Sequence, residues 1–198
     1  MNPDSSPQIP TKITFGEILK EILVFAGMVF IIFFVIRPYI VEPYVVDGAS
    51  MYPTFKTGNY LLVDKLSYEI GKPKRNSVLV FKYPNDQSKS FIKRIIGLPG
   101  ETLVMKNNVL TITNAENPNG FTPDQSYVVN QCQHTGGACV SSFEKTLARD
   151  EYFVMGDNRA ESFDSRSWGP LPKKDILGKP FVRLWPLTKI SILPGNVR

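Results

Sequence analysis

The chain divides into two zones by the spacing of its hydrophobic residues. Residues 22–36 are all apolar or glycine, with Lys20, Glu21 and Arg37 as the flanking charges. After residue 42 the apolar residues come in short runs, several of which alternate with polar residues, and glycine and proline separate the runs. Continuous apolar character is typical of a helix in lipid or in a protein core, whereas short alternating runs are typical of half-buried strands. The pattern predicts one N-terminal helix followed by a mainly β domain.

We interpret residues 15–41 as a transmembrane α-helix. The apolar run alone is shorter than the hydrocarbon core of a bilayer, but Lys20 and Arg37 can extend their charged ends to the headgroups. Pro38 is suited to end the helix. A cleaved secretion signal would need small residues at its end, which this segment lacks. A buried core helix is the other alternative.

The charges around this helix suggest an orientation. Residues 1–14 are rich in proline and serine and are expected to form a disordered tail. Lys12 and Lys20 weakly favour a cytoplasmic N-terminus, which places residues 42–198 outside the cytoplasm. We therefore predict a single-pass protein of a plasma or thylakoid membrane, and the net charge of +5 suits the anionic headgroups of a lipid bilayer.

Residues 42–198 are predicted to fold as an antiparallel β domain. Asn107 and Asn108 lie between two of its alternating runs and predict a hairpin turn. Residues 102–150, which include a long segment rich in Asn, Gly, Pro, Ser and Thr, are interpreted as an inserted peripheral β lobe. The predicted strands are 60–64, 77–83, 90–96, 102–105, 109–113, 151–155 and 188–193.

Ser50 is the strongest candidate nucleophile. A serine hydroxyl reacts only when a neighbouring base removes its proton, and the usual base is histidine. The chain has a single histidine, His134, in a Gly-containing segment that we interpret as a surface loop. Lys93 follows the apolar residues Phe91 and Ile92, and burial there would lower its pKa toward neutrality. The sequence therefore predicts Ser50 as nucleophile and Lys93 as general base.

Residues 156–169 form a third informative block, dense in Asp, Asn, Arg and Ser. Most of it can be interpreted as a turn held by salt bridges. Ser162 is our candidate for the group that holds Lys93 in position, because a hydroxyl favours the ammonium form less than a carboxylate would. We expect structural ion pairs farther out, between the acidic residues Asp157 and Asp164 and the arginines Arg94 and Arg166.

The two cysteines, Cys132 and Cys139, enclose a short loop that a disulfide could close in an oxidising compartment. Two unrelated thiols are the alternative. A metal site formed with His134 would lack a fourth ligand, so we predict no metal, and we also predict no cofactor. The scattered charges and the lack of any nucleic-acid-binding motif predict no nucleic-acid partner.

Four blocks of the sequence together resemble the bacterial type I signal peptidases, membrane-bound Ser/Lys endopeptidases, in their short single-anchor branch. They are residues 50–54, 58–65, 93–100 and 156–169, in the order and spacing of that family. The resemblance implies Ser50 as nucleophile, Lys93 as base and Ser162 as the hydroxyl that positions the lysine. It also implies an antiparallel β-sheet catalytic domain outside the cytoplasm. The implied partners are the signal peptides of preproteins, and we expect a monomer.

Two positions depart from the pattern of this family. Many members carry a serine two residues before the nucleophile, where this chain has Gly48. The backbone N–H of Ser50, with a weaker contribution from the backbone of Gly48, then remains to stabilise the oxyanion. Ala160 replaces an acidic residue that is common in the family.

The resemblance also suggests how a substrate binds. A preprotein segment would add as a β-strand beside residues 91–94 and the chain near Val46, and shallow pockets would select small residues at positions −1 and −3 from the scissile bond. Two other classes remain open: a self-cleaving Ser/Lys peptidase of the repressor type, and a catalytically silent, membrane-anchored β module. The candidate pocket residues, each of which is equally interpretable as core, are Val46, Met51, Phe55 and Ile92.

Overall fold

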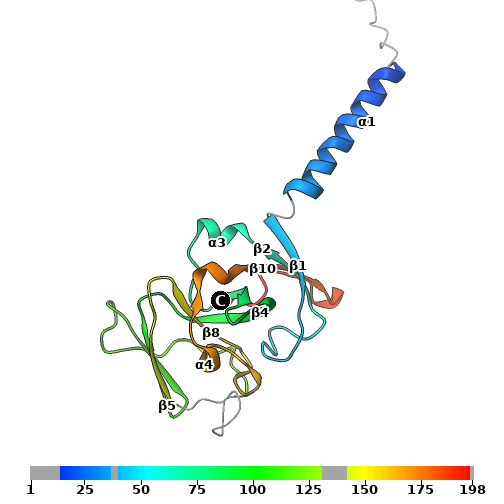
Figure 1. Ribbon diagram of the computed structural model, residues 1–198. Coiled ribbons are helices and arrows are strands. Elements are labelled where there is room, and N and C mark those ends of the chain that lie inside the picture. The colour runs from blue at the N-terminus through cyan, green and yellow to red at the C-terminus, as the bar shows by residue number, and fades with distance from the viewer. Residues whose placement is uncertain (1–13, 37–39, 131–141, 197–198) are drawn as a thin grey trace, which may run out of the picture. The chain divides into compact units, whose positions relative to one another are not determined.

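The computed structural model describes residues 14–36, 40–130 and 142–196 (Figure 1). The chain divides into two compact units, Met1–Tyr39 and Ile40–Arg198. The first unit holds the N-terminal helix and the second holds the strands and all the predicted site residues that the structure describes.

Helix α1 spans Phe15–Phe30 and begins at a capping box. The Thr14 side chain accepts a hydrogen bond from the Glu17 N–H, and the Thr14 N–H donates to the Glu17 carboxylate at 2.8 Å. These two bonds satisfy two backbone N–H groups that have no hydrogen-bond partner within the first turn of the helix. The segment η1, Ile31–Ile36, continues as π-helix. Of the predicted helix over 15–41, residues 37–39 lie outside the described ranges and Val41 begins a strand. Within the described ranges no helix has both the length and the apolar character needed to cross a membrane.

The second unit is built on an antiparallel sheet, as predicted. Strand β4 is an interior strand that pairs with β3 and β8, while β1 at one edge pairs with β2 alone (Figure 1). The strands, in their order across the sheet, are β1 (Val41–Val45), β2 (Tyr60–Asp64), β10 (Ile176–Trp185), β3 (Val78–Tyr83), β4 (Asp86–Gly97), β8 (Glu151–Met155) and β9 (Leu171–Pro172), with β11 (Ser191–Ile192) paired to β10.

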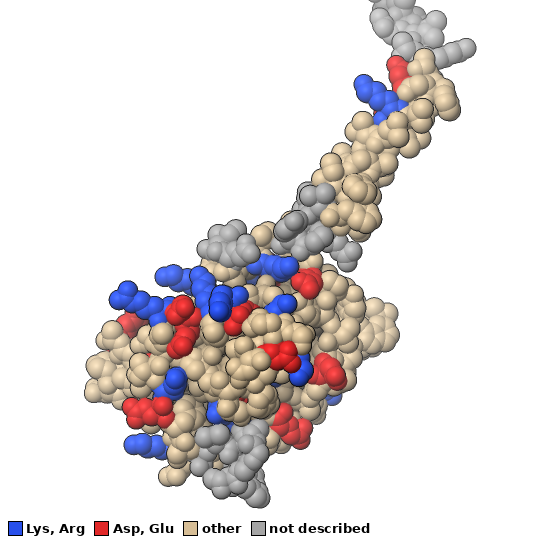
Figure 2. All heavy atoms as spheres, viewed as in Figure 1, with Lys and Arg blue, Asp and Glu red and all other residues tan. Residues whose placement is uncertain are grey.

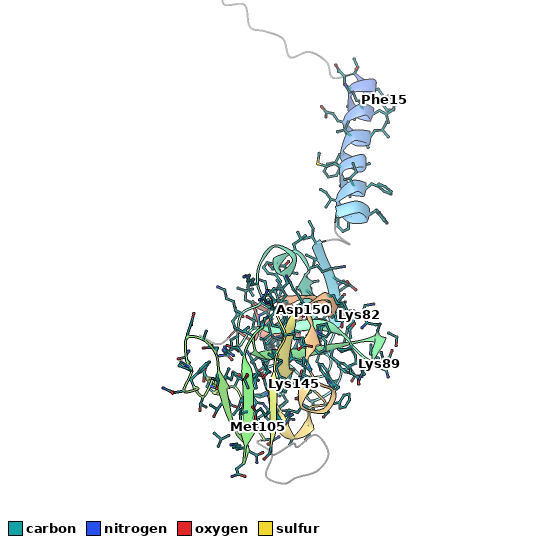
Figure 3. The ribbon with its side chains drawn as sticks, turned by 60° about the vertical axis from the view of Figure 1, so that its left-hand side comes forward. Phe15, Lys82, Lys89, Met105, Lys145 and Asp150 are labelled. Atoms are coloured by element: carbon teal, nitrogen blue, oxygen red, sulfur yellow. The ribbon has the colours of Figure 1, made fainter. Side chains whose placement is uncertain are left out.

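A smaller sheet of three strands has the order β6-β5-β7. Its strands are β5 (Thr102–Lys106), β6 (Val109–Thr113) and β7 (Phe143–Thr146), and the side chains of Met105 and Lys145 mark β5 and β7 in Figure 3. Asn107 and Asn108 join β5 to β6 with φ angles of 49° and 65°. Positive φ at both turn residues is the geometry that asparagine tolerates in tight hairpins, so the predicted turn is confirmed.

Short helices connect these strands. In the described part of this unit, two are α-helical and three are 3₁₀ turns. They are α3 (Leu66–Ile70), α4 (Ser165–Trp168), η2 (Arg159–Glu161), η3 (Lys173–Asp175) and η4 (Leu187–Lys189).

The small sheet shares a hydrophobic core with the main sheet. Leu103 and Leu110 of the small sheet pack in one cluster with Ile96 of β4 and Phe153 of β8. Burial of these apolar side chains from both sheets ties the lobe to the main sheet. A second cluster lies around Leu79, Phe81 and Ile95, and a third around Met51, Phe55 and Leu61.

Six of the predicted strands are confirmed with bounds close to those expected. The predicted strand at 188–193 is mostly wrong, because η4 occupies its first residues and only β11 is extended. Strands β1, β7, β9 and β10 were not predicted.

Figure 2 shows Lys and Arg (blue) and Asp and Glu (red) interspersed over one face of the second unit. The densest group of basic side chains, near the top of that unit in this view, has acidic side chains beside it. The visible charge therefore does not by itself mark a binding face.

Candidate active site

Ser50 lies in the turn-rich connection between β1 and β2. The N–H of Asn158 donates to the Ser50 carbonyl at 3.0 Å, and the Asn158 side-chain amide donates to the Ala49 carbonyl at 3.2 Å. Asn158 is buried and comes shortly after strand β8, so it joins the nucleophile turn to the segment that follows β8. Sequence reasoning did not single out Asn158, although it lies inside the 156–169 block.

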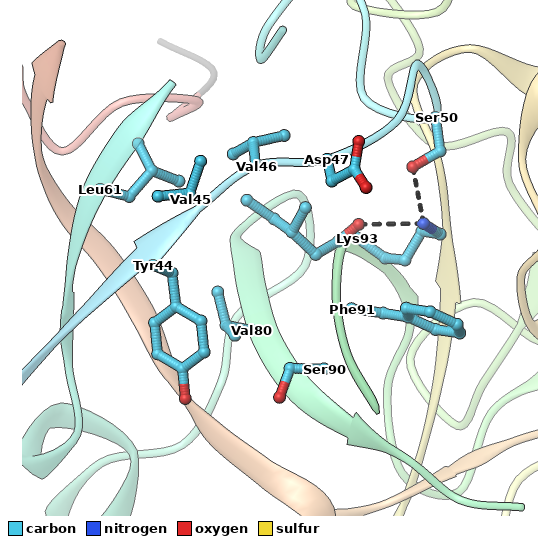
Figure 4. Close-up of a pocket in the computed structure, with 11 residues that line it drawn as sticks. Tyr44, Val45, Val46, Asp47, Ser50, Leu61, Val80, Ser90, Phe91 and Lys93 are labelled. Carbon is cyan, nitrogen blue, oxygen red and sulfur yellow. Dashed lines mark hydrogen bonds between the residues drawn. The ribbon is translucent and has the colours of Figure 1, made fainter. Parts of the chain in front are cut away.

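Lys93 lies on β4 opposite Leu79 of β3, and only 4% of its surface is exposed. Its Nζ is 2.7 Å from Ser50 Oγ and also donates to the Ile92 carbonyl at 3.1 Å (Figure 4). The structure thus brings together the two residues that the sequence proposed as nucleophile and base. They come from segments 43 positions apart.

Burial lowers the pKa of Lys93 to about 8. The main cause is desolvation, which disfavours the ammonium form. The Asp164 carboxylate raises this pKa, the Arg166 guanidinium lowers it, and Asp157 raises it, each by less than desolvation lowers it. A substantial fraction of Lys93 is therefore neutral in mildly alkaline solution.

Arg94 and Asp157 form a buried ion pair beside the dyad. Arg94 Nε and Nη2 donate to the two Asp157 oxygens at 2.8 and 2.7 Å, and both side chains are at most 1% exposed. Thr54 Oγ1 donates to the same carboxylate at 2.6 Å. Because Thr54 belongs to the Ser50 segment and Arg94 to β4, this carboxylate links the two segments that carry the dyad.

Asp164 and Arg166 form the second expected pair. Asp164 accepts two bonds of 2.8 Å from Arg166 and one of 3.0 Å from the Gly156 N–H. Both side chains of the pair are at most 2% exposed. Both ion pairs expected from the sequence are thus present, and both are buried. Two bonds per pair compensate for the desolvation of the charges.

Ser162 is fully buried, but its hydroxyl makes no hydrogen bond within the described part of the chain. The expected bond to Lys93 is therefore not present. Ser162 still lies close to the nucleophile, because a Cβ added at Gly156 would clash with both the Ser162 side chain and the Ser50 carbonyl. Only glycine fits between these two groups.

The backbone donors near Ser50 differ in availability. The Gly48 N–H already donates to Thr57 Oγ1 at 3.0 Å. Across the described residues, no hydrogen bond from the Ser50 N–H is found. The Ser50 amide is thus the better placed of the two to meet a developing oxyanion.

A cavity of about 110 Å³ opens beside the dyad. Val46 and Ile92 line it, as expected, but Met51 and Phe55 do not. These two side chains are at most 1% exposed and pack in a hydrophobic cluster with Leu61 and Val78, so the prediction that they line the pocket is corrected. The lining residues that the sequence analysis did not propose are Tyr44, Val45, Asp47, Leu61, Val80, Ser90 and Phe91.

Two strand edges border this cavity (Figure 4). Strand β1 pairs with β2 on one side, and the structure describes no strand on its other side. On β4, residues Phe91 to Lys93 pair with β3, whereas the pairing with β8 begins at Arg94. Backbone groups on these edges can accept an added extended peptide.

Cys132, His134 and Cys139 lie outside the described residues. In the ranges that the structure does describe, no group of His, Cys, Asp or Glu side chains is arranged to hold a metal ion.

The chain is similar in sequence to several known proteins. A family model described as "Signal peptidase, peptidase S26" matches residues 19–185. A probable signal peptidase I-2 of Synechocystis is 35% identical over 168 residues, 81% of this chain and 71% of that protein. A signal peptidase I of Pseudomonas fluorescens is 33% identical over 86% of this chain and 74% of that protein. A signal peptidase IB of Staphylococcus aureus is 30% identical over 91% of this chain and 97% of that protein.

A crystal structure of a signal peptidase I from Enterococcus faecalis aligns with a TM-score of 0.43 at 29% identity. The alignment covers 55% of this chain and 96% of that one.

Proposed function

Because this chain belongs to the signal peptidase family, peptidase S26, a family of serine peptidases, we propose that it cleaves signal peptides with Ser50 as nucleophile and Lys93 as general base. The observation that carries this proposal is the 2.7 Å contact between Lys93 Nζ and Ser50 Oγ at the edge of a cavity. A neutral lysine amine at that distance can accept the hydroxyl proton directly.

In the acylation step, Ser50 Oγ attacks the carbonyl carbon of the scissile bond while Lys93 Nζ takes the serine proton. The carbonyl oxygen becomes an oxyanion, which the Ser50 N–H stabilises by a hydrogen bond. The C–N bond then breaks, and Lys93 returns the proton to the leaving amine. The mature protein departs with a free N-terminus, and the signal peptide remains as an ester on Ser50.

In the deacylation step, Lys93, neutral again, takes a proton from a water molecule that attacks the ester carbon. The second tetrahedral intermediate collapses by breaking the bond to Ser50 Oγ, and Lys93 gives the proton back to that oxygen. The signal peptide leaves with a carboxylate at its C-terminus. The buried Arg94–Asp157 pair would hold the two catalytic segments together throughout.

Substrate binding is proposed to occur by strand addition between β1 and residues Phe91–Lys93 of β4. An extended peptide there points alternate side chains the same way, so the side chains at −1 and −3 enter the cavity together. The cavity volume of about 110 Å³ and its walls from Val46 and Ile92 support a preference for small apolar residues at these positions. Ser162, buried near Ser50, is proposed to position Lys93 once substrate is bound.

We also propose that the N-terminal segment attaches the enzyme to a membrane, with the catalytic unit outside the cytoplasm. The apolar side chains of α1 support this, since none of the helix is buried and Leu23 and Phe25 are 63% and 67% exposed. Exposed apolar surface on this scale is typical of segments that meet lipid or a partner protein. Membrane-borne preproteins would then reach the site at high local concentration.

The test of the proposed chemistry is a cleavage assay with full-length protein in detergent and a synthetic preprotein, with the cut located by mass spectrometry. Ser50→Ala and Lys93→Ala should each lower turnover by a factor of about 10³ or more, because nucleophile and base act as a unit.

Ser126→Ala and Lys82→Ala, which change exposed residues of the same types, are the matched controls and should cleave like wild type. Circular dichroism should show all four variants folded. A tenth of wild-type turnover in either dyad variant would contradict the assignment.

A further inference from the structure

Asp47 follows strand β1 and lies three positions before Ser50. It lines the same cavity as Ser50 and Lys93, and its side chain is on the exposed rim, in contrast to its buried neighbour Val46. Figure 4 shows the Asp47 carboxylate and the Ser50 hydroxyl projecting toward the same space. A peptide held with its scissile bond at Ser50 therefore passes close to this carboxylate.

Charge at the cavity is unbalanced in the active form of the proposed dyad. Among the described residues that line the cavity, Asp47 is the only carboxylate and Lys93 the only cation. Tyr44 stays neutral, because burial and the neighbouring Glu42 raise its pKa to about 12. When Lys93 is neutral and able to act as a base, Asp47 carries the only formal charge on these walls.

No partner within the described residues neutralises Asp47, which makes no hydrogen bond or ion pair there. The buried carboxylates Asp157 and Asp164 differ in this respect, since each is paired with an arginine. The oxygens of Asp47 remain available to a group supplied by the substrate. An ammonium or guanidinium group would bind there, whereas a second carboxylate would be repelled.

We propose that Asp47 is a specificity determinant that favours substrates with a lysine or arginine at position −2 or +1 from the scissile bond and disfavours acidic residues there. This inference rests on the proposed function, because it assumes that the cut occurs at Ser50. Side chains at −1 and −3 enter the apolar part of the cavity, so the residue that meets the exposed Asp47 is at −2 or +1.

The experiment compares peptides that differ only in having Lys, Gln or Glu at −2, and a second set varied at +1, with full-length enzyme in detergent at low salt. The wild type should show a Lys-to-Glu ratio of kcat/KM of about 5 to 20 at one of these positions, the size expected for a charge reversal near an exposed carboxylate. Asp47→Asn should reduce this ratio to less than about 2, and Asp47→Lys should invert it. Because the Debye length is about 3 Å at 1 M salt, the wild-type ratio should shrink there.

Glu144→Gln, which removes one negative charge from an exposed position on β7, is the matched control and should keep the wild-type ratio. An unchanged ratio in Asp47→Asn and Asp47→Lys would overturn the role of Asp47 while the proposed chemistry stands. Wild-type enzyme that fails to cut even the Gln peptides would overturn the proposed function, and this inference with it. The two failures are therefore distinguishable.

Discussion

Lys93 brings an amino group into a site where water has almost no access. Only 4% of the residue is exposed, and within the described structure Nζ hydrogen-bonds to the Ser50 hydroxyl and the Ile92 carbonyl. Its two carboxylate neighbours, Asp157 and Asp164, are each bonded to an arginine. Desolvation therefore dominates, and the lysine gives up its proton more easily than in water. Two consequences can be measured.

The first is the pH dependence of cleavage. A base must be neutral to accept a proton, and the pKa of Lys93 is lowered to about 8. The value of kcat/KM should therefore rise with pH on a single limb with a midpoint near pH 8. Steady-state assays with a soluble peptide between pH 6 and 10 measure this limb. A midpoint above pH 10, where an ordinary lysine titrates, would show that burial does not activate Lys93.

The second is the pH dependence of stability. Because the folded pKa is lower than the unfolded value of about 10.4, the unfolded chain binds more protons between pH 8 and 10.4, and stability rises with pH in that window. The Lys93→Met variant lacks the titrating amine and therefore lacks this increase of stability with pH. The difference in unfolding free energy between wild type and Lys93→Met should thus change by about 3 kcal/mol in favour of the wild type from pH 7 to 10.5.

Urea denaturation at several pH values gives this difference, and the other titrating groups cancel because both proteins share them. Lys82→Met, at an exposed position on β3, is the control and should differ from wild type by the same amount at every pH. A pH-independent difference for Lys93→Met as well would mean that the pKa of Lys93 is not shifted by folding.

At the scale of elements, strand β10 organises the main sheet, since it pairs with β2, β3 and β11. Its sequence contains Gly178 and Pro180 and does not alternate cleanly, so local pattern did not predict it. The pairing shifts register on either side of these residues, where bulges relieve the lack of a proline N–H. Pro43 in β1 is tolerated for a related reason, because β1 is an edge strand.

Gly178 allows β10 to approach β2 closely, and a Cβ added there would clash with the Asp64 carbonyl. Gly178→Ala should therefore destabilise the catalytic unit by about 1–3 kcal/mol, because the clash is with backbone and cannot be relieved by a rotamer change. Thermal unfolding measures the effect.

Gly27→Ala is the matched control, because a Cβ at Gly27 in α1 meets no atom within 4 Å. This control should leave the unfolding midpoint unchanged. Equal midpoints for both variants would show that β2 and β10 can separate at no cost.

At the scale of the whole molecule, the division into Met1–Tyr39 and Ile40–Arg198 separates the apolar helix from the residues of the proposed site. The catalytic unit begins immediately after the division. The Ile40 carbonyl accepts a hydrogen bond from the Lys65 N–H at 3.0 Å, and Val41 pairs with Asp64. The boundary for a truncation is therefore set by β1 and falls before residue 40.

Deletion of residues 1–39 should leave a folded enzyme that cleaves a soluble peptide with nearly the full kcat/KM of the wild type. Its rate on a preprotein in vesicles should fall by a factor of about 10 or more if residues 1–39 form the proposed membrane tether, because the enzyme and its substrate are then no longer held in the same bilayer. Parallel assays on the two substrates measure both effects.

Deletion of residues 1–45, the comparison truncation, removes β1 and one wall of the cavity and should lose activity on both substrates. An unfolded product from the 1–39 deletion would show that the N-terminal unit supports the fold of the catalytic unit.

Part of this architecture was determined by sequence alone, because it depends on residue type and on neighbours close in the chain. Alternation predicted strands such as β6, and two adjacent asparagines predicted the turn between β5 and β6. The rarity of histidine, together with the apolar neighbours of Lys93, was enough to propose a Ser/Lys pair. These inferences need only local spacing and the chemistry of single side chains.

Tertiary structure alone decided which residues meet across the sheet. Met51 and Phe55 are as apolar as Val46, yet they face the core, while Asp47 and Tyr44 reach the cavity. Asn158 holds the Ser50 turn from more than a hundred positions away. The physical reason is that the cavity is lined by residues of β1 and β4, which are not neighbours in the sheet because β2, β10 and β3 lie between them in the strand order. Local pattern carries no information on such long-range pairing.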